Sequence, residues 1–134
     1  FGAMSLYEIA SGATEFFVWA TANFDVFWLS SRTSDGSIEN AERAFRHASP
    51  SAMRSGQLSA QIRSIPASQW ETAKISGIDI TRPFFWIDDD PDLTSIAHLN
   101  DGDLMQRLIK VSVDSEVDLL SSLPRIITER MKSL

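Results

Sequence analysis

The sequence contains no cysteine, which excludes disulfide bonds, zinc sites built from thiolates and a cysteine nucleophile. No apolar run approaches the roughly 20 residues that a helix needs to cross a bilayer, so we expect no membrane partner. Basic residues are also scarce: 12 Lys and Arg stand against 18 Asp and Glu, and the formal net charge is -6. This balance disfavours binding to DNA or RNA, which requires a basic surface. We therefore expect a cytoplasmic protein that binds neither membrane nor nucleic acid.

The signatures of several enzyme classes are also absent. There is no P-loop, no glycine-rich dinucleotide fingerprint and no Ser/His/Asp arrangement. His47 and His98 each lack a second histidine three or four residues away, so we expect them on helix surfaces rather than as metal ligands. What is present is ordinary for a globular protein: 134 residues, 43% of them hydrophobic and 22% charged. This length predicts a single domain over residues 1–134.

Charge is unevenly distributed along the chain. Residues 32–64 hold five arginines against three acids, and residues 88–118 hold nine acids against two basic residues. The first region would attract an anion and the second a cation. Solvated helix faces are the alternative explanation, and charge bias alone favours them.

Hydrophobic periodicity predicts helices that alternate with short apolar strands. Helices are expected at 5–23, about 37–48, 68–78, 92–101 and 114–134, and strands at 25–31, 82–87 and 107–113. Ser68 and Glu71 form the Ser-x-x-Glu box that is typical of a helix start, and Pro124 is expected in a first turn or at a break. Because strands joined through helices are usually parallel, this order predicts a mainly parallel sheet with helices on both faces.

Two of the predicted strands end in polar clusters, "SSR" at 30–32 and "DDD" at 88–90. In open parallel sheets, ligands bind beyond the carboxyl ends of the strands. A hydroxyl at Ser30 can donate a hydrogen bond to a phosphoryl oxygen, and Lys74, on the helix between the two strands, can neutralise phosphate charge. Carboxylates are the ligands that Mg²⁺ prefers. The pattern therefore indicates a site for a phosphate and a divalent cation.

These residues also resemble a known family. "FDVFWLSS" (24–31), "WETAKISGID" (70–79) and "PFFWIDDD" (83–90) occur in the order and spacing found in the haloacid dehalogenase superfamily, especially its small bacterial members. The resemblance covers about residues 11–114. It implies a three-layer α/β sandwich with a mainly parallel Rossmann-like sheet and a Mg²⁺-dependent phosphohydrolase that acts on a small phosphorylated metabolite.

The resemblance also implies a role for each site residue. Ser30 and Lys74 would be catalytic and, with Ser31, would bind the phosphate. Asp88 and Asp89 would hold Mg²⁺, directly or through water. The two later carboxylates, Asp90 and Asp92, would be secondary.

One motif of that family is absent from the chain. Its first strand carries Asp-x-Asp, which supplies the nucleophile, and residues 1–8, "FGAMSLYE", hold no aspartate. Three explanations stay open: a chain that lacks its natural start, a non-catalytic member that binds a ligand or partner, or a likeness of sheet architecture alone. The missing strand is central in the family, so we expect a separate or swapped strand in its place, or a rearranged sheet. A homodimer formed through the open sheet edge is a further hypothesis.

Each candidate also has a purely structural explanation. Residues 88–90 are equally well explained as an acidic turn that precedes a helix, and residues 30–31 as a loop after a strand. For Lys74 the alternative is an exposed helix cation, which is by far the commoner case for a lysine. Five arginines are candidates for an anion-attracting rim, with scattered surface charge as the favoured alternative: Arg32, Arg43, Arg46, Arg54 and Arg63.

Overall fold

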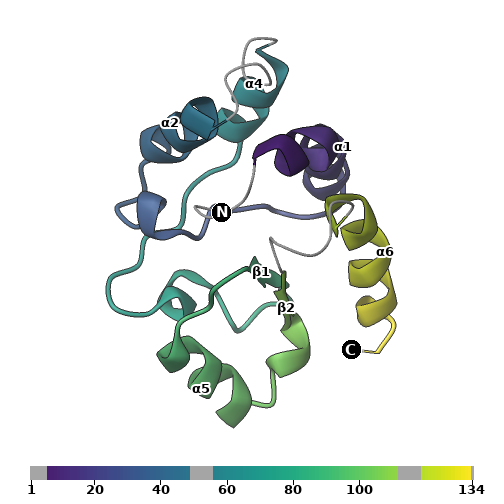
Figure 1. Ribbon diagram of the computed structural model, residues 1–134. Helices are drawn as coiled ribbons and strands as arrows, with labels where there is room; N and C mark the ends of the chain where they lie inside the picture. The colour runs from purple at the N-terminus through teal and green to yellow at the C-terminus, as the bar shows by residue number, and fades with distance from the viewer. Residues whose placement is uncertain (1–5, 49–55, 112–118, 134) are drawn as a thin grey trace.

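The computed structural model describes residues 6–48, 56–111 and 119–133 (Figure 1). The elements in chain order are α1 (Leu6–Asn23), the 3₁₀ turn η1 (Ser31–Thr33), α2 (Glu39–Ala48), α4 (Gln57–Ser64), η2 (Lys74–Gly77), β1 (Trp86–Asp88), α5 (Leu93–Asp101), η3 (Met105–Arg107), β2 (Leu108–Lys110) and α6 (Leu119–Met131). The mixed α/β class expected from the sequence is confirmed. None of the helices in these three ranges is long and apolar enough to span a membrane.

The one named sheet is formed by β1 and β2, which pair in parallel. Trp86 is aligned with Leu108, and Asp88 with Lys110. The connection between the two strands runs through α5, because parallel neighbours need a long crossover rather than a hairpin. The expected parallel arrangement therefore holds for this pair.

A second parallel contact is an isolated bridge between Trp28 and Ala67. The Trp28 N–H donates to the Pro66 carbonyl, and the Trp28 carbonyl accepts from the Ser68 N–H, both at 2.8 Å. The strand expected over 25–31 is therefore reduced to one bridged residue. Its partner at Ala67 was not predicted, because residues 49–67 carry no strand pattern.

The other two strands are shorter than predicted. The expected strand over 82–87 is limited to Trp86–Asp88, and the one over 107–113 to Leu108–Lys110. Residues 112 and 113 lie outside the described residues. At the other end, the Arg107 N–H donates to the Leu104 carbonyl within η3, so the strand begins one residue later.

The helix predicted at 68–78 is wrong. The segment is irregular until η2, and Ala73, just before that turn, is extended (φ -137°, ψ 135°). The reason lies in tertiary hydrogen bonds: Ser68 N–H donates to Trp28, and Trp70 N–H donates to the Ser34 carbonyl at 3.0 Å. These contacts hold the chain extended along residues 28–34, and they override the local preference for a helix.

The core consists of two apolar clusters. The first includes buried residues of α1, α4 and α6 together with the bridged strand and β2: Phe16, Phe17, Ala20, Trp28, Leu58, Ile62, Ile65, Ile109, Val111, Leu123 and Ile127. The second lies around η2 and α5: Ala73, Ile75, Trp86, Leu99 and Leu108. Because side chains alternate along a strand, Ile87 packs on the first cluster and its neighbour Trp86 lies in the second. Figure 1 shows α1 and α6 packed together, with α5 at the far end of the molecule.

Pro124 lies inside α6 without breaking it, which contradicts the expected break or first-turn position. The helix continues from Leu119 to Met131, although proline cannot donate a backbone hydrogen bond. Leu123, directly before the proline, and Ile127, one turn after it, are almost fully buried in the first cluster. Packing of this face against α1 therefore compensates for the one missing bond.

Candidate functional site

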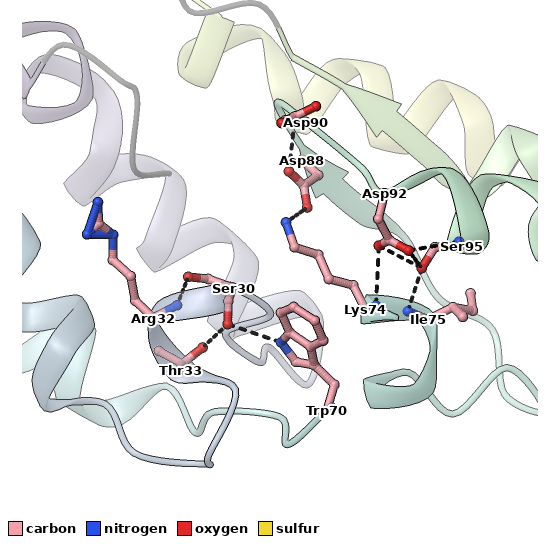
Figure 2. A network of polar contacts seen from close by, with 10 residues as sticks. All are labelled: Ser30, Arg32, Thr33, Trp70, Lys74, Ile75, Asp88, Asp90, Asp92 and Ser95. Atoms are coloured by element: carbon pink, nitrogen blue, oxygen red, sulfur yellow. Dashed lines mark hydrogen bonds and ion pairs between the residues drawn. The ribbon is translucent and has the colours of Figure 1, made fainter. Parts of the chain in front are cut away.

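Polar residues gather at the carboxyl ends of the two strand segments, as Figure 2 shows. Asp88 is the last residue of β1, and Ser30 directly precedes η1 after the bridged strand. Lys74 is the first residue of η2. The order of elements thus places the three main candidates of the sequence at one edge.

Lys74 and Asp88 form an ion pair in which Asp88 is buried and Lys74 is partly buried. The Lys74 Nζ lies 2.8 Å from Asp88 Oδ2, and the two side chains are 16% and 5% exposed. The other oxygen, Oδ1, accepts a hydrogen bond from the Asp90 N–H at 2.9 Å. Removing two charges from water is costly, and this geometry compensates for that cost only while both partners are present. Lys74 is therefore not the exposed helix cation of the alternative explanation.

Ser30 caps the turn that follows it. Its Oγ accepts from the Arg32 N–H at 3.0 Å, and its carbonyl accepts from the N–H of Thr33 at 3.1 Å. The Ser30 hydroxyl hydrogen is not used by another residue in the described ranges, so it can donate to a ligand. Ser31 begins η1 and is exposed.

Trp70 ties the Ser30 end to the Lys74 segment. Its indole Nε1–H donates to the Ser30 carbonyl at 3.1 Å, four residues before Lys74 (Figure 2). Next to it, the Gln69 side chain donates to the Asp35 carbonyl at 3.0 Å. The loop that carries the hydroxyl and the segment that carries the ammonium are therefore held together.

The remaining carboxylates have different surroundings. Asp89 is half-buried, Asp90 is exposed, and Asp92 caps α5 by accepting from the Ser95 N–H at 3.0 Å. Burial opposes ionisation of Asp92, but hydrogen bonds from Ser95 and from the Lys74 N–H hold its pKa below the ordinary value. Within the described ranges, no group of three or more His, Cys, Asp or Glu side chains is placed to hold a metal ion.

The arginines do not form a free rim around this edge. Arg46 and Arg63 both bind the buried Glu42, and Arg63 is the main reason why the pKa of Glu42 lies below its ordinary value. Arg32 and Arg43 are exposed, and Arg54 lies outside the described residues. This cluster links α2 to α4.

The sequence predicted Lys74 and Asp88 in one site, but it did not predict that they pair or which residues support the pair. Trp70 carries no sequence signal for its bond to Ser30, because the two are 40 residues apart in the chain. Asp92 and Ser95 do carry one, since Asp three residues before Ser at a helix start is a typical N-cap arrangement. His47 and His98 are exposed on helices, as expected.

Comparison with protein-family models, with curated proteins and with solved structures gives no significant match. The function must therefore be argued from the site. A partly buried ammonium, a hydroxyl able to donate and carboxylates at the carboxyl ends of two strand segments can bind an oxyanion next to a cation.

Proposed function

We propose that this chain is a haloacid-dehalogenase-like domain of a Mg²⁺-dependent phosphohydrolase that acts on a small phosphorylated metabolite. The observation that carries the proposal is the buried contact of Lys74 Nζ with Asp88 Oδ2, at the edge where Ser30 also lies. An ion pair between the buried Asp88 carboxylate at a strand end and a partly buried lysine is costly to desolvate, so its place at this edge supports a functional role.

In the proposed site, Ser30 donates a hydrogen bond to one phosphoryl oxygen, with Ser31 beside it. Lys74 neutralises the phosphate charge and holds the attacking group. Asp88 and Asp89 lie on the cation side. The Trp70 indole fixes the separation of hydroxyl and ammonium by its bond to the Ser30 carbonyl.

The backbone directions of the two strand segments support a missing central strand. Trp28 directs both its N–H and its carbonyl to residues 66–68, so Phe27 and Leu29 direct theirs to the opposite side. Asp88 accepts from Val111 beyond β2, so the backbone groups of Ile87 point away from β2. Among the described residues, the backbone groups of Phe27, Leu29 and Ile87 have no hydrogen-bond partner.

The two open edges belong to segments that run side by side. Near their amino ends, the Phe24 and Phe85 rings lie 6.4 Å apart, and Arg82 lies 3.7 Å from Asp25. At their carboxyl ends, residues 70–74 contact both Ser30 and Asp88. The two segments are therefore linked at both ends by side-chain contacts.

We infer that one strand fills this position and that it carries the Asp-x-Asp motif. With that strand, the two parallel pairs would join into one sheet. Helices α1, α4 and α6 would cover one face, and α5 would cover the other, which gives the three-layer sandwich. The Phe27 side chain, 56% exposed beside the open edge, is a large apolar group for which the present structure provides no cover.

The described residues form only part of a magnesium site. The Asp88 oxygens already contact Lys74 and the Asp90 N–H, and no three potential ligands converge in the described ranges. Magnesium would supply charge neutralisation at the phosphate when bound. Its remaining ligands would come from the inserted strand.

The proposal is tested with the full-length gene product and p-nitrophenyl phosphate in the presence of Mg²⁺. We expect Mg²⁺-dependent hydrolysis that falls at least about 100-fold in Asp88→Asn and in Asp89→Asn, as is typical when charge stabilisation is lost. Ser30→Ala should lower the activity, and Ser30→Thr should retain most of it because the hydroxyl remains. Activity that survives both aspartate variants would rule out the cation role.

A non-catalytic, ligand-binding member of the same family is the second candidate. It is favoured by the incomplete set of metal ligands and by the satisfied Lys74–Asp88 pair. It predicts no turnover and no Asp-x-Asp sequence encoded upstream of Phe1. Light scattering at several concentrations tests the homodimer that pairing of the open edges would produce.

A further inference from the structure

The turn that carries Lys74 has no cap of its own. Ala73, at the capping position, has no side-chain oxygen, so the first N–H groups of η2 need acceptors from elsewhere. Two side chains at the start of α5 supply them. The Lys74 N–H donates to Asp92 Oδ1 at 3.3 Å, and the Ile75 N–H donates to Ser95 Oγ at 2.9 Å.

These two side chains are also bonded to each other. The Ser95 hydroxyl lies 2.8 Å from the Asp92 carboxylate, and the Ser95 N–H donates to it at 3.0 Å. Ser95 is fully buried, so its hydroxyl has no access to solvent as an alternative partner. Asp92 therefore has two roles at once: it caps α5, and it accepts a hydrogen bond from the backbone N–H of Lys74.

Lys74 is thus held at both ends by carboxylates only four residues apart. Asp92 contacts its backbone N–H, and Asp88 contacts its Nζ, as Figure 2 shows. The two carboxylates lie on one short segment between β1 and α5, which fixes the distance between the base and the tip of the lysine side chain. A lysine side chain that is fixed at its tip alone could still shift with its turn.

We propose that Asp92 and Ser95 are positioning residues that hold the Lys74 ammonium at the carboxyl end of β1, rather than ligands of a cation. The consequence for turnover rests on the proposed function, whereas the anchoring itself does not. The low pKa of Asp92 agrees with this role, because an ionised carboxylate is the stronger acceptor for both N–H groups.

The test separates helix capping from lysine positioning. Asp92→Ser keeps a side chain that caps α5 but has a single oxygen, so the Lys74 N–H loses its acceptor. Asp92→Asn keeps a carbonyl oxygen and serves as the conservative variant. Asp101→Asn, exposed at the other end of α5, is the matched control. All are made in the full-length gene product.

Amide hydrogen exchange and the side-chain ammonium NMR signal of Lys74 are the readouts. In Asp92→Ser, we expect exchange at Lys74 and Ile75 to accelerate about 10- to 100-fold, the effect of losing a hydrogen bond to a charged group, and the ammonium signal to broaden. Asp92→Asn should show a smaller effect, and Asp101→Asn none.

Unchanged exchange at Lys74 in Asp92→Ser, or equal acceleration at all amides, would overturn the anchoring. If exchange responds as expected while the wild type hydrolyses no phosphate ester, the anchoring stands and the proposed function fails. If the wild type is active and Asp92→Ser hydrolyses p-nitrophenyl phosphate with unchanged kcat and KM, the positioning role is refuted while the proposed function stands.

Discussion

Replacing Lys74 with methionine should destabilise the protein strongly, because it leaves the Asp88 carboxylate without its partner. That carboxylate is 5% exposed and would keep only the hydrogen bond from the Asp90 N–H. Removing one member of a buried ion pair costs about 3–5 kcal/mol, because the remaining charge cannot be solvated. A domain of this size has a total stability of about 5–15 kcal/mol, so this is a large share.

The assay is equilibrium unfolding in urea, followed by tryptophan fluorescence. With a slope of about 1–3 kcal/mol per M, the loss of about 3–5 kcal/mol should lower the midpoint by about 1–5 M at an unchanged slope. The double variant Lys74→Met with Asp88→Asn removes both charges, and it should recover most of the stability. The matched control is Arg82→Met, since Arg82 and Asp25 form a pair whose side chains are 71% and 79% exposed.

The exposed control pair should contribute no more than about 1 kcal/mol. The reasoning is refuted if Lys74→Met costs no more than Arg82→Met, or if the double variant is less stable than Lys74→Met alone. Either result would mean that the Asp88 charge is not buried against Lys74. Lys74 would then not be the ion-pair partner of Asp88.

Further predictions concern α2 and the two glycines with positive φ. The pKa of Glu42 in the folded state lies below its ordinary value of 4.5, mainly because of the hydrogen bond from Arg63. The ionised Glu42 side chain therefore stabilises the fold above pH 4.5, and this stabilisation is lost as the pH falls through the folded-state pKa. Urea midpoints measured from neutral pH downward should therefore fall less steeply for Glu42→Gln than for the wild type, and parallel curves would contradict this. Gly36→Ala should cost more than Gly56→Ala: both have positive φ, but a Cβ at Gly36 would meet the Gln69 side chain at 2.9 Å, whereas the space at Gly56 is open. Equal melting temperatures for the two variants would show that the Gln69 side chain moves away at no cost.

Local patterns were sufficient to predict most helices. The periodic apolar residues predicted α1, and Asp92 before an apolar run marked the start of α5. The patterns failed at 68–78, where a convincing capping box lies in a segment held extended by residues 28–34. A local signal contains no information about a hydrogen-bond partner 40 residues away, which is why tertiary contacts decided the conformation there.

The sequence predicted which residues lie at the site, but it did not predict the contacts that hold them in place. Strand ends in an alternating α/β chain meet at one edge, and this rule predicted that Ser30 and Asp88 lie at the same edge, where Lys74 contacts Asp88. Spacing alone did not reveal that Asp92 would contact the backbone of the Lys74 turn, because that contact depends on how α5 packs against η2. The extent of the sheet was also beyond prediction, since strand pairing depends on a neighbour that the pattern does not specify.

We propose that the Lys74 ammonium binds a phosphoryl group and neutralises its charge. The most direct measurement is the ¹H–¹⁵N NMR signal of Lys74 Nζ in the full-length gene product, during titration with inorganic phosphate and Mg²⁺, with Lys74→Arg used to assign it. The account predicts a saturable shift of this signal that is weakened in Ser30→Ala and retained in Ser30→Thr. A Lys74 signal that stays unchanged while phosphate binds elsewhere would contradict it.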